Sequence, residues 1–217
     1  MSALSFLRMV WTAGRGVVVG LPEATEHSDP VLLFREWFDA AKRCGLLEPS
    51  AMTLATCPES GQPSGRTVLL KAADERGFTF YTNYGSRKAR ELAENERAAL
   101  VFHWPVLGRQ ITVEGRVRTV SREEAATYFR SRPRGSQIGA WASKQSQPLT
   151  SRSALEQRYQ ELEREFRGKE VGLPPFWGGY LLEPTRIQFW QAGVNRLHDR
   201  IAFVRNGEAW EATRLYP

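Results

Sequence analysis

Five strand-like runs follow one another closely in the middle of the chain, and their spacing limits the possible folds more than any other feature. Each run is short and rich in β-branched or aromatic residues, and turn signals such as Glu59-Ser60-Gly61 separate them. Because few helical patterns intervene, the spacing favours antiparallel pairing in a barrel or a sandwich. The runs are Met52–Cys57, Arg66–Lys71, Phe78–Asn83, Ala98–Trp104 and Gln110–Val120.

Helical patterns flank and punctuate this region. The expected helix starts are Asp29-Pro30, Ser86, and two capping boxes, Ser121 with Glu124 and Ser153 with Glu156. Further strands are expected at Gly179–Leu182, Arg186–Gln191, Asp199–Val204 and Ala209–Arg214. The sequence therefore predicts one α+β domain over residues 29–217, built on an antiparallel barrel. Residues 1–28 are expected to form a flexible N-terminal segment that could act as a lid.

The charge balance points to an anionic partner. Lys plus Arg outnumber Asp plus Glu by 30 to 24, and the pI is about 9.6. Nucleic acid, an acidic membrane surface and a phosphorylated small molecule all fit this excess. The two cysteines, Cys44 and Cys57, form no disulfide framework, which favours a reducing compartment, and a cytoplasmic location is expected. No residue cluster has metal-ligand spacing, and no apolar run is long enough to span a bilayer.

The segment Gly85-Ser86-Arg87-Lys88 places two cations in the first turn of an expected helix. The amino end of a helix carries partial positive charge, so acidic residues are usual there. An anion bound at the free N–H groups, most commonly phosphate, would remove this conflict. The alternative is two solvated side chains on a surface helix, which this motif alone slightly favours.

Two further groups of side chains could bind phosphate. Tyr128 and Arg132 share a helix face, and Ser136 follows in the expected next loop, so all three could converge on a phosphate ester. A helix-end arginine and a core-edge tyrosine are an equally good interpretation. Arg66 and Lys71 differ in strand parity, so they are expected to point to opposite sides of the sheet.

The segment from Arg196 to Arg200 places Arg196, His198 and Arg200 on one face of an expected strand. Three neighbouring cations repel when His198 is protonated, which favours a site for an anionic aromatic ligand over a structural role. These residues alone predict a small barrel with several candidate phosphate sites. They do not predict a redox reaction.

Taken together, several segments resemble the pyridoxine/pyridoxamine 5′-phosphate oxidase family in order and spacing, from about Asp29 to Pro217. They are Arg66-Thr67-Val68-Leu69-Leu70-Lys71, Phe80-Tyr81-Thr82-Asn83, Gly85-Ser86-Arg87-Lys88, Tyr128-Phe129-Arg130-Ser131-Arg132-Pro133, Ser136-Gln137-Ile138-Gly139-Ala140, Phe176-Trp177-Gly178-Gly179, Phe189-Trp190-Gln191, Arg196-Leu197-His198-Asp199-Arg200 and Arg214-Leu215-Tyr216-Pro217. The resemblance implies a split β-barrel homodimer that binds FMN at two equivalent sites between the subunits.

The resemblance also implies roles for individual residues. The FMN-binding set from one subunit would be Arg66, Thr67, Val68, Leu69, Leu70, Lys71, Tyr81, Thr82, Arg87, Lys88 and Gln110, and the partner subunit would supply Gln145, Ser146, Trp190 and Arg200. The substrate phosphate would be held by Lys71, Tyr128, Arg132 and Ser136. Arg196 and His198 would lie over the pyridine ring as the catalytic pair, and Arg8, with Trp11 in place of the family's tyrosine, would belong to a substrate lid.

The implied reaction is the oxidation of pyridoxine or pyridoxamine 5′-phosphate by oxygen to pyridoxal 5′-phosphate and hydrogen peroxide. Three alternatives remain open. One is another enzyme on the same barrel, such as the related oxidase of phenazine biosynthesis or a flavin reductase. The second is a nucleic-acid-binding module, which the spread of the arginines over many motifs disfavours. The third is a carrier that binds flavin or pyridoxal phosphate without consuming oxygen.

Overall fold

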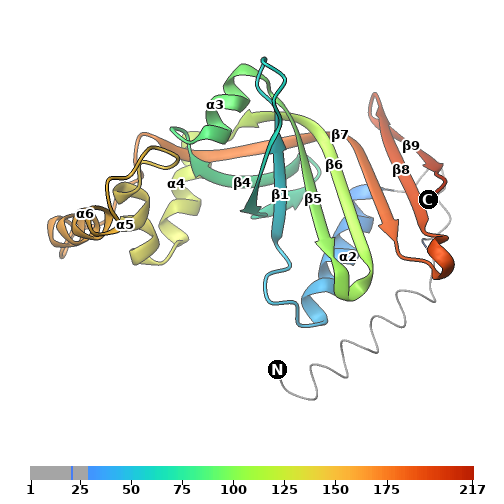
Figure 1. The fold of residues 1–217 in the computed structure, drawn as a ribbon, viewed down its shortest axis with the longest axis horizontal. Helices are drawn as coiled ribbons and strands as arrows, with labels where there is room; N and C mark the ends of the chain where they lie inside the picture. The colour runs from blue at the N-terminus through green and yellow to red at the C-terminus, as the bar shows by residue number, and fades with distance from the viewer. Residues whose placement is uncertain (1–20, 22–28) are drawn as a thin grey trace.

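One long strand, β7 (Trp177–Gln191), organises the fold because it pairs with three other strands. The computed structural model describes Leu21 and residues 29–217 (Figure 1). Along one edge, β7 pairs with β6 (Arg109–Thr119). Along its other edge, the first part of β7 pairs with β4 (Gly77–Asn83) and the last part with β8 (Asp199–Asn206). The sheet therefore divides at β7, which confirms the predicted α+β class and split antiparallel barrel.

The remaining strands extend this sheet on both sides. They are β1 (Ala51–Thr56), β2 (Ser64–Leu69), β3 (Ala72–Asp74), β5 (Arg97–Trp104) and β9 (Ala209–Arg214). The order is β2-β1-β5-β6-β7-β4-β3, with β8 branching from β7 and β9 pairing with β8, and every pairing among the described strands is antiparallel. Each of the five central runs predicted from the sequence forms a strand within two residues of its expected bounds.

The two strands predicted between Gly179 and Gln191 are one continuous strand in the structure. Pro184 interrupts the sequence pattern, but the pairing register shifts between Glu114 and Gly115, so the proline lies at a bulge where its missing N–H is tolerated. A Cβ on Gly115 would lie 2.0 Å from the backbone oxygen of Glu183. A glycine is therefore required where the two backbones approach at the bulge.

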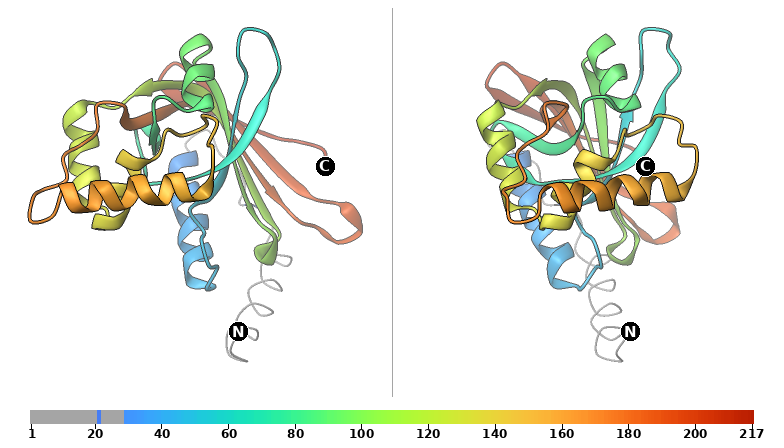
Figure 2. Two further views of the ribbon diagram at one scale, coloured as in Figure 1. Left: turned by 60° about the vertical axis from the view of Figure 1, so that its left-hand side comes forward. Right: turned by 90° about the vertical axis from the view of Figure 1, so that its left-hand side faces the viewer.

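The helix α2 (Pro30–Arg43) fills the inside of the curled sheet (Figure 2). The carboxylate of Asp29 accepts a hydrogen bond from the Val31 amide at 2.7 Å, which confirms the predicted helix start. Phe34 is fully buried, and its ring lies 4.8 Å from that of Phe78 and 5.0 Å from that of Phe102, both on strands of the sheet. The main hydrophobic core therefore lies between α2 and the sheet.

Three helices form an arm beside the barrel, on the left in Figure 1. They are α4 (Arg122–Ser131), α5 (Arg134–Ala142) and α6 (Arg152–Glu165). A second core joins this helical arm to the sheet through Phe129, Ile138, Leu162 and Trp177. The start of β7 therefore holds the arm against the barrel.

Two details of the arm differ from the sequence prediction. The capping box predicted at Ser153 and Glu156 is wrong, because Ser151 caps α6 and accepts a hydrogen bond from the Ala154 amide at 3.1 Å. Ser136 is not in a loop but inside α5, which the sequence pattern did not predict. The box at Ser121 is confirmed, since its hydroxyl accepts from the Glu124 amide. Across the described part of the chain, no helix has the length and apolarity needed to cross a membrane.

Candidate active site

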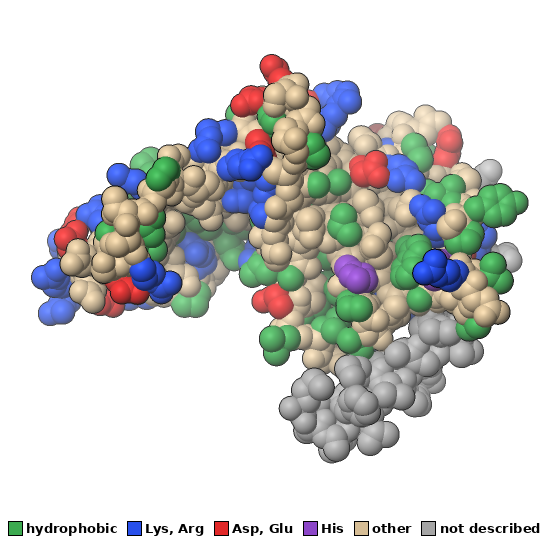
Figure 3. All heavy atoms as spheres, viewed as in Figure 1, with side chains coloured by type: hydrophobic (Ala, Val, Ile, Leu, Met, Phe, Trp, Pro, Cys, Tyr) green, Lys and Arg blue, Asp and Glu red, His purple; other side chains and the backbone are tan. Residues whose placement is uncertain are grey.

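An open cleft of about 630 Å³ lies between the helical arm and the barrel. Its walls come from the end of β2, from β4, from the start of α3 (Arg87–Glu94), and from α4 and α5. Figure 3 shows lysine and arginine side chains gathered between the arm and the barrel. Many of the residues expected to bind flavin or substrate line this cleft: Thr67, Val68, Leu69, Lys71, Tyr81, Thr82, Lys88, Tyr128, Arg132, Ser136 and Gln145. Leu70 is instead buried in the main core.

A stack of aromatic rings and one guanidinium forms one wall of the cleft. The rings of Tyr81 and Tyr128 are stacked at 4.0 Å, and Trp177 is nearly parallel to Tyr81 at 5.5 Å. The guanidinium of Arg132 lies 4.8 Å from the centre of the Trp177 ring, a favourable cation–π distance. The Lys71 ammonium lies 6.0 Å from the Tyr128 ring centre. The four residues expected to hold the substrate phosphate therefore meet in one chain.

Arg132 has unused hydrogen-bonding capacity. Its Nη1 atom is buried and has no hydrogen-bond partner among the residues that the structure describes. Burial lowers the pKa of this guanidinium, although an arginine stays charged at neutral pH. A buried N–H group without a partner is costly, so an anionic ligand at this position would remove a penalty as well as add an attraction.

Lys88 forms a second cationic position at the start of α3. Its side chain is only 8% exposed, and its Nζ donates to the Thr82 hydroxyl at 3.1 Å and to the Gln145 side-chain oxygen at 3.1 Å. Burial, and then the charge of Arg66, lower the pKa of Lys88 to about 8. Ser86 occupies the predicted cap position, but its side chain makes no capping bond and instead accepts from Lys88 at 3.3 Å.

Arg66 and Arg87 approach this position from β2 and α3 and share one carboxylate. Arg66 Nη2 lies 3.1 Å from one oxygen of Glu91, and Arg87 Nε lies 2.7 Å from the other. Arg66 and Lys71 contact different groups, but this does not test the prediction from strand parity, because Lys71 lies beyond the end of β2, in the cleft. Glu91 was not recognised in the sequence, although its i, i+4 spacing from Arg87 is a usable signal.

The other predicted site residues form a separate cluster at the far end of β7. Gln110 is paired with Trp190, and Trp190 with Arg200, across adjacent strands. The ring centres of Trp190 and His198 are 4.6 Å apart. Arg200 donates through Nη2 to Gln188 at 3.2 Å, while its buried Nε has no partner within the described residues.

The expectation that Arg196, His198 and Arg200 share one strand face is wrong. Arg196 lies in a short 3₁₀ turn (Val194–Arg196) with φ at +63°, and only Arg200 lies within β8. The turn is closed tightly because the Gly193 amide donates to Nδ1 of His198 at 3.1 Å. Since Nδ1 accepts this bond, the neutral imidazole carries its hydrogen on Nε2.

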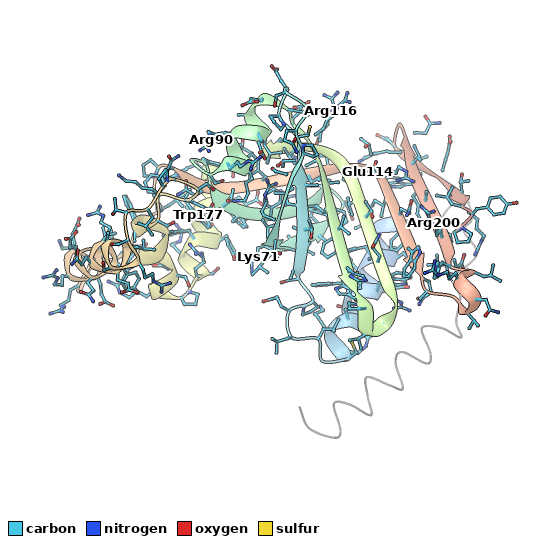
Figure 4. The ribbon with its side chains drawn as sticks, viewed as in Figure 1. Lys71, Arg90, Glu114, Arg116, Trp177 and Arg200 are labelled. Atoms are coloured by element: carbon cyan, nitrogen blue, oxygen red, sulfur yellow. The ribbon has the colours of Figure 1, made fainter. Side chains whose placement is uncertain are left out.

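The cleft and the far cluster do not meet within one chain. On β7, Gly179 pairs with Tyr81 beside the cleft, and Trp190 lies in the far cluster. At the usual rise per residue, the stretch of β7 from Gly179 to Trp190 is about 35 Å long. Figure 4 shows Lys71 and Trp177 close to the cleft and Arg200 distant from both.

The contacts within this chain differ from two of the implied placements. Gln145 was expected to reach the site from the partner, but it bonds Lys88 and Thr82 of its own chain. Gln110 was expected beside Tyr81, but it lies in the far cluster with Trp190. Ser146 follows Gln145 with φ at +68°. The expected lid residue Arg8 lies outside the described residues.

Two family models match most of the chain. Residues 38–165 match the family model described as pyridoxamine 5′-phosphate oxidase, and residues 177–217 match the pyridoxine 5′-phosphate oxidase C-terminal dimerisation region. The chain belongs to the pyridoxine/pyridoxamine 5′-phosphate oxidase family. As a member of this family, the protein is an oxidoreductase. Apart from Gln110, the residues of the far cluster fall within the matched dimerisation region.

Relatives named pyridoxine/pyridoxamine 5′-phosphate oxidase align over almost the whole chain. The Rubrobacter xylanophilus protein is 56% identical, with 91% of each chain covered. The Colwellia psychrerythraea protein is 49% identical, with 100% of each chain covered. Among solved structures, PhzG from Burkholderia lata 383 in complex with tetrahydrophenazine-1-carboxylic acid has a TM-score of 0.87 at 33% identity, covering 93% of this chain and 100% of that one.

Proposed function

We propose that the protein is a homodimer that uses FMN to oxidise pyridoxine 5′-phosphate or pyridoxamine 5′-phosphate to pyridoxal 5′-phosphate, with oxygen as the electron acceptor and hydrogen peroxide as a product. The observation that carries this proposal is the pair of cationic positions in one cleft, one around Lys88 and one around Arg132. A flavin phosphate and a substrate phosphate would require two such positions.

The charge at each position suits a phosphate monoester. Around Lys88, three cations surround one carboxylate, Glu91, which leaves a net charge of +2. Lys71 and Arg132 also give +2, and no described residue forms an ion pair with either of them. A phosphate ester carries a charge of about −1.5 to −2 at neutral pH. The residues therefore fit two phosphate groups without burying unbalanced charge.

The residues of this chain would contribute mainly position. With FMN bound, two electrons and a proton can leave the substrate carbon as a hydride equivalent, and oxygen then accepts the electrons. Lys71, Arg132 and Ser136 would anchor the substrate phosphate and so fix the reacting carbon, an effect that can lower a barrier by several kcal/mol. The stacked rings of Tyr81 and Tyr128 would exclude water from one side of the cleft.

The far cluster would complete the site from the partner chain. Arg196 and His198 lie in the segment that matches the dimerisation region, and they do not reach the cleft of their own chain. His198 would present Nε2–H, so it would donate a hydrogen bond to the substrate oxygen or nitrogen rather than accept a proton there. Arg196 would lie over the pyridine ring and hold the substrate.

A steady-state assay tests this function directly. The purified protein should be yellow, release FMN on denaturation, and produce hydrogen peroxide with pyridoxine 5′-phosphate. Pyridoxine without its phosphate should be a poor substrate, because Lys71 and Arg132 would then remain without their anion. Equal kcat/KM values for the two compounds would contradict the proposed substrate anchor.

A second candidate is the oxidation of a reduced phenazine carboxylate, which the TM-score of 0.87 to the PhzG complex favours. A carboxylate carries one negative charge and a phosphate ester nearly two, so the paired cations Lys71 and Arg132 suit the phosphate better. Turnover of tetrahydrophenazine-1-carboxylic acid at a higher kcat/KM than pyridoxine 5′-phosphate would favour the second candidate.

A further inference from the structure

One buried carboxylate joins three separate elements beneath the proposed flavin-phosphate position. Glu91 is 5% exposed. Its Oε2 accepts hydrogen bonds from Thr56 of β1 at 2.5 Å and from Ser64 and Arg66 of β2 at 2.6 and 3.1 Å. Its Oε1 accepts from Arg87 at 2.7 Å, on its own helix. We call Thr56, Ser64, Arg66, Arg87 and Glu91 the Glu91 network.

The Glu91 network keeps its carboxylate ionised. Burial would raise the pKa of Glu91, but hydrogen bonds from Ser64, Thr56 and Arg87, together with the charge of Arg66, hold it at about 2. A buried carboxylate beside a proposed anion site has an obvious electrostatic cost, because it repels the phosphate that the neighbouring cations attract. We therefore expect a favourable effect of Glu91 that offsets this repulsion.

The geometry indicates what that effect is. Glu91 engages Nε of Arg87, and the described contacts of that side chain leave both terminal nitrogens available. Arg66 is fixed further, because its Nη1 donates to the Leu54 backbone oxygen at 3.0 Å and to the Thr56 hydroxyl at 2.5 Å, and its Nη2 also donates to the Ser64 hydroxyl. The described contacts of Arg66 therefore leave its Nε–H available. The donors that remain, the two terminal nitrogens of Arg87 and Nε of Arg66, are therefore presented in fixed directions, which suits phosphate recognition.

We propose that Glu91 is a positioning residue for the flavin phosphate, because it orients Arg66 and Arg87 and reduces the net charge of the three cations around it to +2. This inference rests on the proposed use of FMN. Glu91 itself would not touch the phosphate. It would also hold Arg66 close to Lys88, two cations that would otherwise repel each other.

Two substitutions separate orientation from charge. Glu91→Gln keeps the shape and removes the charge, whereas Glu91→Asp keeps the charge and shortens the side chain so that it cannot reach both arginines. If Glu91 affected the phosphate only through its charge, Glu91→Gln would bind FMN more tightly and Glu91→Asp would bind it as the wild type does. Positioning predicts that both variants bind FMN more weakly, by about tenfold or more, since each loses a charge-assisted hydrogen bond.

The test is a pair of flavin titrations on the full-length chain freed of its flavin by dialysis. Quenching of flavin fluorescence would give the dissociation constants of FMN and of riboflavin, which lacks the phosphate. The matched control is Glu94→Gln, an exposed carboxylate on the same helix. We expect FMN to bind the two Glu91 variants at least about tenfold more weakly, with riboflavin binding unchanged and the control equal to wild type.

Other outcomes would overturn the inference. Tighter or unchanged FMN binding by both variants would do so, and so would an equal loss of FMN and riboflavin binding, which would indicate a merely structural role. If Glu91→Gln did not fold, Glu91→Asp alone would give the same comparison. A wild-type chain that bound riboflavin as tightly as FMN would overturn the proposed use of FMN itself, and that result is separate from any effect of the variants.

Discussion

Removing the Arg132 guanidinium should weaken turnover of the phosphorylated substrate and leave turnover of its unphosphorylated form unchanged. Arg132 is held over Trp177 by a cation–π contact, and its buried Nη1 has no protein partner in the described part of the chain. The bound phosphate is expected to accept one or two hydrogen bonds from this guanidinium, each contributing about 1.5–3 kcal/mol because both groups are charged.

The expected loss of activity follows from this number of hydrogen bonds. Taking about 3 kcal/mol for the pair of bonds in a partly solvated cleft, Arg132→Ala should lower kcat/KM for pyridoxine 5′-phosphate about a hundredfold. The same change should alter kcat/KM for pyridoxine by less than about threefold, because pyridoxine has no phosphate to lose. The flavin content should stay at the wild-type level, since Arg132 is not part of the Lys88 position.

The assay is steady-state hydrogen peroxide production with both substrates. The control is Arg130→Ala, which removes an exposed arginine near the end of α4, two residues before Arg132, where it contacts Thr127 rather than the cleft. An equal loss of activity with both substrates would indicate a general disturbance of the cleft. That result, or no loss with the phosphorylated substrate, would refute the role of Arg132 as the phosphate anchor.

Three further predictions concern pH, the bulge at Gly115, and the turn that begins at Gly193. Burial and a neighbouring arginine lower the pKa of Lys88 to about 8, so its protonated form should hold the flavin phosphate below pH 8. FMN affinity should therefore fall by up to about tenfold between pH 8 and 9. In fluorescence titrations, Lys88→Met should remove this pH dependence. Gly115→Ala places a methyl group 2.0 Å from a backbone oxygen and should lower the free energy of unfolding in urea by about 3 kcal/mol, whereas Gly139→Ala, in an uncrowded helical position, should not lower it. Gly193→Ala would bring Cβ to 1.9 Å from the backbone oxygen of Leu197 and displace His198, so kcat should fall while flavin content stays constant. An unchanged kcat would contradict the proposed role of this turn in placing His198.

Much of the fold follows from local sequence signals. The alternation and turn residues around the central strands are strong, and the caps at Asp29 and Ser121 are confirmed by their side-chain hydrogen bonds. The continuity of β7 could not be predicted, because Pro184 looks like a strand end until the bulge in the neighbouring strand is known. The short helix α5 was missed because Gly135 and Gly139 weaken its pattern.

The site was predictable as separate pieces. Each cationic motif was visible in the sequence, and the structure gathers Lys71, Tyr128, Arg132 and Ser136 in one cleft. Which pieces lie together in one chain depends on tertiary contacts, and therefore the sequence did not show that Gln145 lies beside Lys88 of its own chain.

The structure also corrects the prediction that the segment around His198 is an extended strand. The expected strand face assumed extended backbone, but the positive φ of Asn195 and Arg196 creates a turn that no residue pattern indicated. Positive φ is uncommon for residues other than glycine, and its cost is typical of functional segments.

The most direct test of the account is a heterodimer with one substitution in each chain. Arg132→Ala damages the cleft of one chain and Arg196→Ala damages the far cluster of the other, so a site shared between chains leaves one of the two sites intact. Each substituted homodimer should be nearly inactive with pyridoxine 5′-phosphate, and the heterodimer, purified through two different tags, should recover about half of the wild-type activity. A heterodimer no more active than the two homodimers would mean that each site is built from one chain, which would contradict the account.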